Sequence, residues 1–306
     1  MTTLATASTR HQAGDPAADR QEARDGLNGP TIRRHRLGLE LRRLREAAGL
    51  RLEDAATGLG IAASTLSRIE TGQALARTSY VRMLLDRYGL TTDAEFHQLI
   101  DLAREGQRKG WWTDYRHLLP AGAGTYLGLE GAASVNRTFA VQVIPGLLQT
   151  SDYAAAVCRS ARPDLGESAI RSLAAAASRR RGFLLQPHHV HAIIDESALL
   201  RSVGTTSIMA AQMTYLRELA ADPCFTVQIL ALSGPRGVLS VPFTVLSFPD
   251  PADPDVACRA GSEGQVALIR RRTVISALRD SFDALSLAAM SAEESASLIS
   301  EMTKTQ

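Results

Sequence analysis

Apolar residues recur at helical spacing along residues 37–103 and are divided into short segments by glycines. Residues 52–72 predict two short helices joined at Gly60, where a left-handed backbone is accessible at low cost. Leu66 and Ile69 define the buried stripe of the second of these helices. The pattern therefore predicts a bundle of short helices that contains a helix-turn-helix unit.

The second helix of this unit carries short polar side chains at its front and an arginine one turn later. Such a helix suits insertion into the DNA major groove. Serine and threonine are also common on the surfaces of helices in ordinary all-α cores, so the pattern alone leaves this plainer interpretation open. Five residues are expected to face the groove: Ala63, Ser64, Thr65, Ser67 and Arg68.

Four helices with these short joints resemble the Cro/C1 (Xre-type) repressor domain, and residues 41–49 and 64–72 carry the resemblance. The resemblance implies a double-stranded DNA operator that a homodimer reads at inverted half-sites. Since alanine cannot pair bidentately with a base, readout is expected to depend mainly on Arg68. Three positions depart from the usual phosphate-binding glutamine, helix cap and longer base-reading side chain: Leu52, Ala62 and Ala63.

The net charge of +2 conceals an asymmetry along the chain. Residues 31–90 contain eleven arginines and six acidic residues, a net charge of +5, whereas residues 111–306 contain seventeen basic and eighteen acidic residues. Positive charge is therefore concentrated around the predicted helix-turn-helix, where phosphates would lie. Four arginines are expected to contact the phosphate backbone: Arg33, Arg34, Arg36 and Arg51.

A chain of 306 residues is too long for one helix-turn-helix unit, so a second domain is expected. Residues 1–30 lack periodicity and predict a disordered arm, residues 31–105 predict the DNA-binding domain, and residues 106–110 predict a hinge. Residues 111–306 predict an α+β effector or partner-binding domain. The predicted fold is mainly α: a Cro/C1-type helix-turn-helix bundle followed by an α+β domain with a small antiparallel sheet.

The predicted sheet is a meander of short β-rich segments that Gly, Pro and Asp separate. Residues 127–135 are expected to be helical, and residues 190–195 to form a further strand. Trp111 and Trp112 could stack on a ligand, but we favour a role in anchoring the core of the second domain. The segments of the meander are residues 225–230, 243–248, 256–259 and 265–269.

A second resemblance lies in residues 143–154, 194–201 and 212–216. These segments are similar to an actinobacterial family of WhiJ-like and Scr1-like regulators, also described as antitoxin-like. Its members join a Cro/C1 head to one C-terminal domain of uncharacterised biochemistry. The resemblance implies that the second domain binds a small partner protein encoded nearby. Residues 256–260 depart from the family by lacking a usual tyrosine and glutamate.

Candidate catalytic groups do not converge in the sequence. Asp195 and Glu196 are adjacent, and neighbouring residues on a strand point to opposite faces. His189 and His191 could share a face and offer two metal ligands, but no third ligand stands at a recognisable spacing. Three scattered cysteines argue against a disulfide framework. We therefore expect no enzyme, catalytic residue, cofactor or metal.

These patterns favour a sequence-specific transcriptional regulator whose second domain senses a small partner protein or a ligand. The alternative is an enzymatic C-terminal domain, with the helix-turn-helix used for localisation or autoregulation. No apolar run approaches the roughly 18 residues of a membrane span, and no signal-peptide core is present. The expected location is the cytoplasm, at the nucleoid and without membrane contact.

Overall fold

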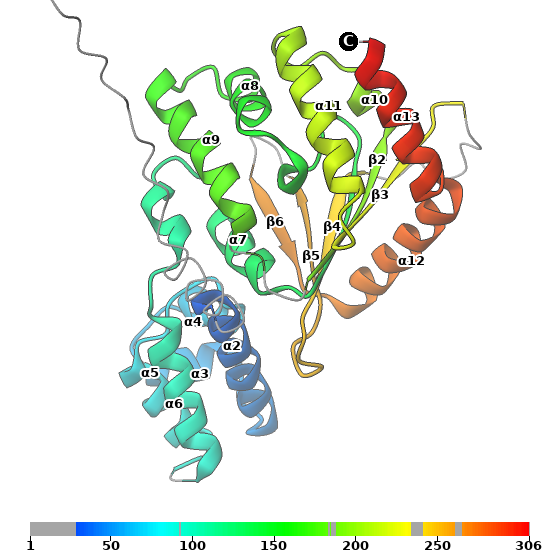
Figure 1. Cartoon of the computed structure of the whole chain (residues 1–306). Helices are drawn as coiled ribbons and strands as arrows, with labels where there is room; N and C mark the ends of the chain where they lie inside the picture. Colours follow the sequence, from blue (N-terminus) through cyan, green and yellow to red (C-terminus); the bar gives the residue numbers. More distant parts are fainter. Residues whose placement is uncertain are drawn as a thin grey trace, which may run out of the picture.

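The computed structural model describes residues 29–91, 93–182, 184, 188–233, 241–260 and 265–305. The chain forms a small helical head and a larger body in which helices cover a β-sheet (Figure 1). The predicted disordered arm falls almost entirely outside the described residues. In the described part of the chain, no helix combines the length and the apolar composition needed to cross a membrane.

The head confirms the predicted helical bundle. Gly60 has a φ of +66°, so the turn between α3 (Leu52–Gly58) and α4 (Ala63–Glu70) uses the left-handed backbone that glycine accepts. Apolar residues spaced along each helix bury one face in a common core that includes Leu41, Leu66 and Leu84. The helices of the head are α2 (Pro30–Ala47), α3 (Leu52–Gly58), α4 (Ala63–Glu70), α5 (Thr78–Arg87) and α6 (Ala94–Gly106).

The body is built on a six-stranded sheet with the order β3-β2-β1-β4-β5-β6. Strands β1, β2 and β3 run parallel, whereas β4, β5 and β6 pair antiparallel with their neighbours. The register places Asn136 of β1 beside Val190 of β2 on one side and Leu246 of β4 on the other. The strands are β1 (Val135–Ala140), β2 (His189–Asp195), β3 (Phe225–Leu230), β4 (Phe243–Ser247), β5 (Val256–Ala260) and β6 (Val266–Ile269).

The prediction of a small, purely antiparallel sheet is therefore wrong, although four of its β-rich segments do form β3 to β6. The strand that was missed is β1, which joins the parallel and antiparallel halves at the centre of the sheet. Its buried positions include Asn136 and Thr138, which hide the apolar alternation of an ordinary strand. Thr138 is satisfied inside the protein because its hydroxyl lies 2.9 Å from that of Thr244 on β4.

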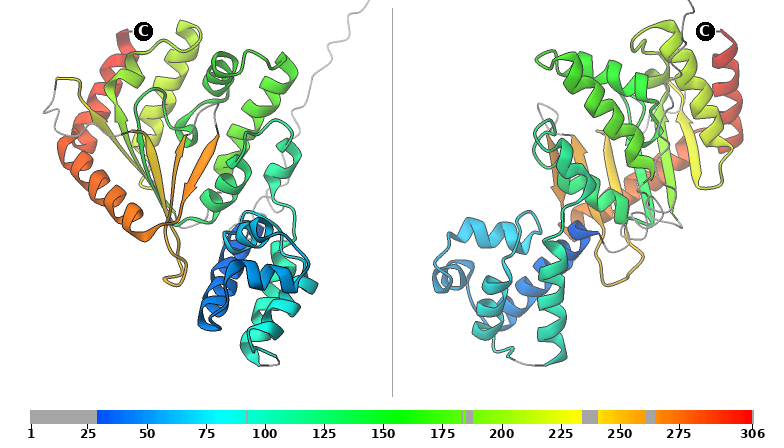
Figure 2. Two further views of the ribbon diagram at one scale, coloured as in Figure 1. Left: turned by 180° about the vertical axis from the view of Figure 1, so that it is seen from behind. Right: turned by 60° about the vertical axis from the view of Figure 1, so that its left-hand side comes forward.

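Helices cover both faces of the sheet (Figures 1 and 2). Val190, Ala192 and Ile194 of β2 pack in a core with α8, α11 and α13, whereas Ile193 points to the opposite face, against α12. This alternation follows from the two-residue repeat of a strand. The helices of the body are η1 (Trp111–Tyr115), α7 (Ala123–Ala132), η2 (Gly146–Leu148), α8 (Ser151–Ala161), α9 (Glu167–Gly182), α10 (Glu196–Leu200), α11 (Thr206–Ala220), α12 (Arg272–Ala288) and α13 (Ala292–Thr305).

Helix α2 belongs to the cores of both head and body. Its C-terminal half contributes Leu41 to the head, whereas Ile32 packs in a body cluster that includes Leu129 and Phe248. The approach to α7 is close: a Cβ atom added to Gly128 would lie 2.1 Å from the hydroxyl oxygen of Thr31. The head is thus attached to the body by packing as well as by residues 107–110, the connection between α6 and η1.

Trp112 lies at this same attachment, with its ring against glycines. Cβ atoms added to Gly110, Gly124 or Gly128 would each lie 3.0 Å or less from a ring carbon of Trp112. Trp111 contacts the Trp112 ring edge-on at a centroid distance of 6.2 Å. The position of Trp112 against α7 agrees with the predicted anchoring role.

Candidate nucleic-acid interface

Helix α4 presents the residues that the sequence assigned to the DNA groove. Leu66 and Ile69 are 0% and 3% exposed and hold its inner face in the head. The outer face is open: three of the predicted residues are exposed and two are partly exposed. The exposed set is Ser64, Thr65 and Arg68, and the partly exposed pair is Ala63 and Ser67.

The front of α4 has no side-chain cap. Ala62 occupies the N-cap with extended backbone (φ −67°, ψ 143°), and its methyl group cannot accept a hydrogen bond from the first turn. The uncapped N–H groups and the positive end of the helix dipole therefore face outward, an arrangement that favours a phosphate.

Restoring the missing cap should stabilise the head. We expect Ala62→Ser to raise the free energy of unfolding by about 1 kcal/mol, because a serine hydroxyl can accept a hydrogen bond from the first turn. Denaturant unfolding of the full chain measures the difference. Ala48→Ser, at the C-cap of α2 where no helical N–H awaits an acceptor, is the matched control. Equal effects of the two substitutions would contradict the capping argument.

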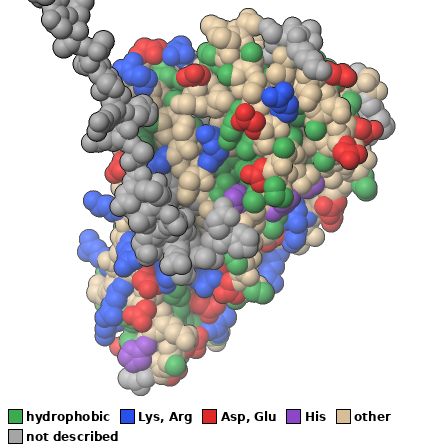
Figure 3. All heavy atoms as spheres, in the orientation of Figure 1, with side chains coloured by type: hydrophobic (Ala, Val, Ile, Leu, Met, Phe, Trp, Pro, Cys, Tyr) green, Lys and Arg blue, Asp and Glu red, His purple; other side chains and the backbone are tan. Residues whose placement is uncertain are grey.

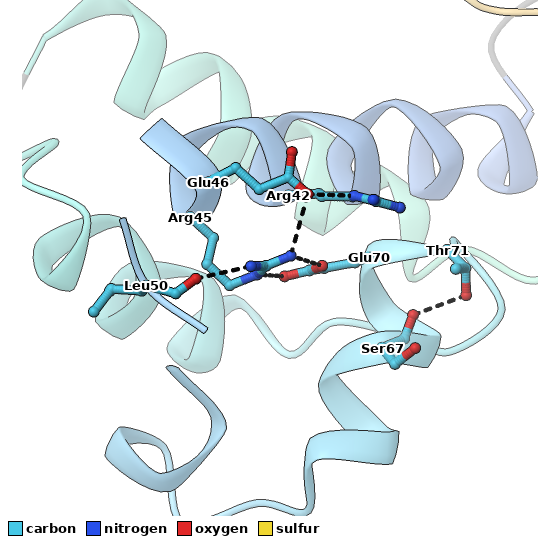
Figure 4. A network of polar contacts seen from close by, with 7 residues as sticks. All are labelled: Arg42, Arg45, Glu46, Leu50, Ser67, Glu70 and Thr71. Atoms are coloured by element: carbon cyan, nitrogen blue, oxygen red, sulfur yellow. Dashed lines mark hydrogen bonds and ion pairs between the residues drawn. The ribbon is translucent and has the colours of Figure 1, made fainter. Parts of the chain in front are cut away.

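The far end of α4 is tied to α2 by a buried ion pair (Figure 4). Arg45 Nε and Nη2 donate to the two carboxylate oxygens of Glu70 at 2.7 and 3.0 Å, and Nη1 donates to the carbonyl of Leu50 at 2.9 Å. The two residues are only 9% and 5% exposed. Hydrogen bonding to Glu70 raises the pKa of the Arg45 guanidinium. This pair fixes the orientation of α4 relative to α2.

Gly38 brings α2 and α4 together at the same place. A Cβ atom at Gly38 would lie 2.5 Å from the backbone oxygen of Glu70 and 2.6 Å from that of Ile69. The sequence analysis missed both Glu70 and Gly38 as determinants of this surface. A signal was available for Glu70, because a carboxylate in the last turn of a helix is unfavourable beside the helix dipole unless a cation offsets it.

The four arginines predicted to contact phosphates divide into two groups. Arg51 is the N-cap residue of α3 and, like Arg68, is exposed. Within the described residues, neither Arg51 nor Arg68 forms an ion pair, so both guanidinium groups are available to an anion. On the face that Figure 3 shows, basic side chains follow the outer edge of the head on the side of α5.

Arg33, Arg34 and Arg36 instead lie where the head meets the body. Arg36 Nε lies 2.6 and 2.8 Å from the two carboxylate oxygens of Asp253, and Nη2 lies 3.0 Å from Asp250. Arg33 forms an ion pair with Glu105, while Arg34 donates to the carbonyl of Pro30 and the hydroxyl of Thr31. The structure thus engages these three side chains within the protein and leaves Arg51 and Arg68 as the available members of the predicted set.

Two parts of the chain match known families. Residues 36–99 match a family described as a helix-turn-helix domain, and this match includes α3, α4 and α5. Residues 123–301, more than half of the chain, match the family described as a domain of unknown function, DUF5753. The chain belongs to the DUF5753 family. No curated protein and no solved structure matches it.

The matches confirm the predicted organisation of a helix-turn-helix head followed by one conserved C-terminal domain. The helix-turn-helix match indicates DNA binding. The DUF5753 match covers α7 through most of α13 and assigns no activity.

The carboxylate pair of the DUF5753 domain diverges. Asp195 caps α10 by accepting a hydrogen bond from the backbone N–H of Ser197 at 3.0 Å. Glu196 accepts a hydrogen bond from the backbone N–H of Leu232 at 2.8 Å. Because each carboxylate binds a different backbone segment, the two do not form a shared acid–base site in this structure.

The histidines of β2 are engaged with the neighbouring strand. His189 and His191 lie on one face, as expected, with Nε2 atoms 3.0 Å from the Thr226 hydroxyl and 2.7 Å from the Gln228 side-chain oxygen. Burial lowers the pKa of His191, which also packs edge-on against Phe282 at 4.9 Å. Their geometry is that of cross-strand packing within the sheet.

Proposed function

We propose that this chain is a sequence-specific transcriptional regulator that binds an operator in double-stranded DNA through the outer face of α4. The observation that carries the proposal is the contrast between the two faces of this helix. Leu66, Ile69 and Glu70 lock the inner face to the head, whereas Ser64 and Arg68 stand exposed. A rigid helix with a free arginine on its outer face is suited to reading base edges in a major groove.

In this proposal the protein acts as a homodimer on inverted half-sites, and the DUF5753 domain senses a small partner protein or a ligand. The similarity to WhiJ-like, antitoxin-like regulators of actinobacteria supports a partner protein encoded nearby. We also propose that the DUF5753 domain acts by binding and not by catalysis. The divergence of Asp195 and Glu196 supports this view over the enzymatic alternative.

Arg68→Ala tests the assignment of the recognition surface. We expect the substitution to weaken binding to the selected operator by about 10–100-fold, because one bidentate arginine–base contact contributes about 1–3 kcal/mol of discrimination. Thermal stability should hardly change, since the side chain is exposed. The operator is first selected from random DNA with the full-length protein, and affinity is then measured at a fixed salt concentration.

Arg104→Ala is the matched control, because Arg104 is an exposed arginine of the same head that lies on α6 and pairs with Asp101. It removes the same charge without touching α4. Equal losses in both variants would show a nonspecific charge effect and contradict readout by Arg68. Failure of the well-folded protein to enrich any sequence, alone or with the neighbouring gene product, would overturn the regulator proposal.

A further inference from the structure

Two adjoining cavities share the β4–β5 loop: the larger lies within the DUF5753 domain, and the smaller lies between this domain and the head. The larger, of about 490 Å³, is an open hollow bordered by the β4–β5 loop and the first turns of α12. The other, of about 350 Å³, lies between the same loop and helices α2 and α6. In Figure 1 this loop reaches from the sheet towards the head. Each volume falls within the roughly 300–1,000 Å³ of small-molecule sites.

The lining of the larger cavity combines apolar and polar groups in similar proportion. Phe248, Ile275 and the two prolines of the loop, Pro251 and Pro254, supply the apolar surface. The polar surface comes from three aspartates of the loop, Asp250, Asp253 and Asp255, and from one face of α12, where residues at positions i, i+4 and i+7 line the cavity. These residues are Arg272, Ser276 and Arg279.

The charges around the two cavities are paired with one exception. Every carboxylate that lines them contacts an arginine, and all but one of the lining arginines contact a carboxylate. Within the described residues, Arg272, which lines both cavities, is the exception. The pairs are Arg36 with Asp250 and Asp253, Arg43 with Glu40, and Arg279 with Asp255.

We infer that the larger cavity is an effector site for a small molecule that carries a carboxylate or phosphate beside an apolar group. The guanidinium of Arg272 binds the anionic group of this molecule. A guanidinium without a carboxylate partner offers an incoming anion a charge-assisted, bidentate contact. A cationic ligand would have to displace an arginine from a lining carboxylate. The apolar walls then receive the body of the ligand.

The site lies next to the connection between the domains. Asp250 and Asp253 line both cavities and hold Arg36, which lies on the same helix as Arg45, the partner of α4. An occupant that shifts this loop therefore acts on α2 and, through it, on the recognition helix. This second half of the inference rests on the proposed function, whereas ligand binding itself does not.

Isothermal titration calorimetry on the full-length protein tests the site directly. The probes are phenyl phosphate and benzoate, which distinguish a phosphate from a carboxylate preference, and benzylamine, a cation of similar shape. We expect one-to-one binding of at least one anion and none of benzylamine. Arg272→Ala should weaken the anion by about tenfold or more. Arg271→Ala, the neighbouring exposed arginine at the N-cap of α12, should bind as the wild type does.

Absence of anion binding, or anion binding that Arg272→Ala retains, would contradict the proposal that the cavity binds an anion through Arg272. A second measurement adds saturating phenyl phosphate or benzoate to the operator complex, where the operator affinity of the wild type should change and that of Arg272→Ala should not respond. An unchanged operator affinity with the anion bound would contradict the proposal that this site regulates DNA binding. Anion binding by a protein that binds no DNA would instead contradict the proposed function but support the proposed ligand site.

Discussion

Replacing Glu70 with glutamine is expected to lower the free energy of unfolding by about 3–5 kcal/mol, because it removes the buried carboxylate that pairs with the Arg45 charge. The Arg45 side chain is only 10% exposed and cannot turn to solvent without opening the contact between α2 and α4. Operator binding should be lost together with stability, since the same pair orients α4. Denaturant unfolding of the full-length protein, followed by DNA titration, measures both effects.

Two comparisons make this prediction specific. Glu46→Gln removes a carboxylate that also contacts Arg45 but is 53% exposed, so the loss should stay within about 1 kcal/mol. The double substitution Arg45→Met with Glu70→Leu should recover most of the stability lost in Glu70→Gln, because it removes both charges from the core. Equal losses at Glu46 and Glu70 would contradict a structural role for the buried pair.

The helical head was predictable because its signals are local. Apolar spacing within each helix and a glycine at the turn are both properties of neighbouring residues, and the structure follows them. The exposed residues of α4 were predictable for the same reason, since burial of Leu66 and Ile69 determines which positions face outward.

The partners of the arginines were not predictable in the same way. Arg36 contributes to the positive charge of the head exactly as Arg68 does when charges are counted along the chain, but its partner Asp253 lies 217 residues away. Charge composition therefore located the basic domain without showing which guanidinium groups the fold already uses. Only the packing of α2 against the body distinguishes Arg36 from Arg51.

The sheet was mispredicted for a related reason. Strand β1 is flanked on both sides by other strands, and its buried residue Thr138 is satisfied by Thr244, 106 residues away in sequence. Its other buried polar residue, Asn136, donates to Glu130 at 3.5 Å, and within the described residues its side-chain oxygen has no partner. Parallel pairing of β1 with β2 also spans the intervening helices α8 and α9. No local pattern reports such a pairing, whereas the antiparallel strands β4, β5 and β6 follow one another closely enough to be recognised.

The contact between the head and the body predicts that the stability of the protein depends on pH through His35. This residue of α2 is 2% exposed, its ring lies 6.5 Å from that of Phe248, and neither ring nitrogen has a hydrogen-bond partner within the described residues. Burial, with a smaller contribution from the charge of Arg270, lowers the pKa of His35 from 6.5 to about 3. The folded protein therefore holds His35 neutral where the unfolded chain would bind a proton.

Between these two pKa values the unfolded state binds more protons, so the free energy of unfolding falls as the pH falls. From pH 7 to pH 5 the contribution of His35 to this loss should be about 2 kcal/mol. His35→Phe keeps a ring beside Phe248 but cannot be protonated, and should lose correspondingly less stability over this range. Denaturant unfolding of both proteins at each pH gives the difference.

The comparison isolates His35 because every other titrating group is common to both proteins. His35→Leu repeats the test with a smaller apolar side chain, should phenylalanine be too large for the junction. At pH 7 either variant should be nearly as stable as the wild type, since the buried ring nitrogens form no hydrogen bond with any of the residues that the structure describes. His97→Phe, at an exposed position on α6, should leave the wild-type pH dependence in place. Parallel stability curves for wild type and His35→Phe would show that the imidazole is not held neutral at the junction, and the head would then be more loosely docked than its packing against Phe248 implies.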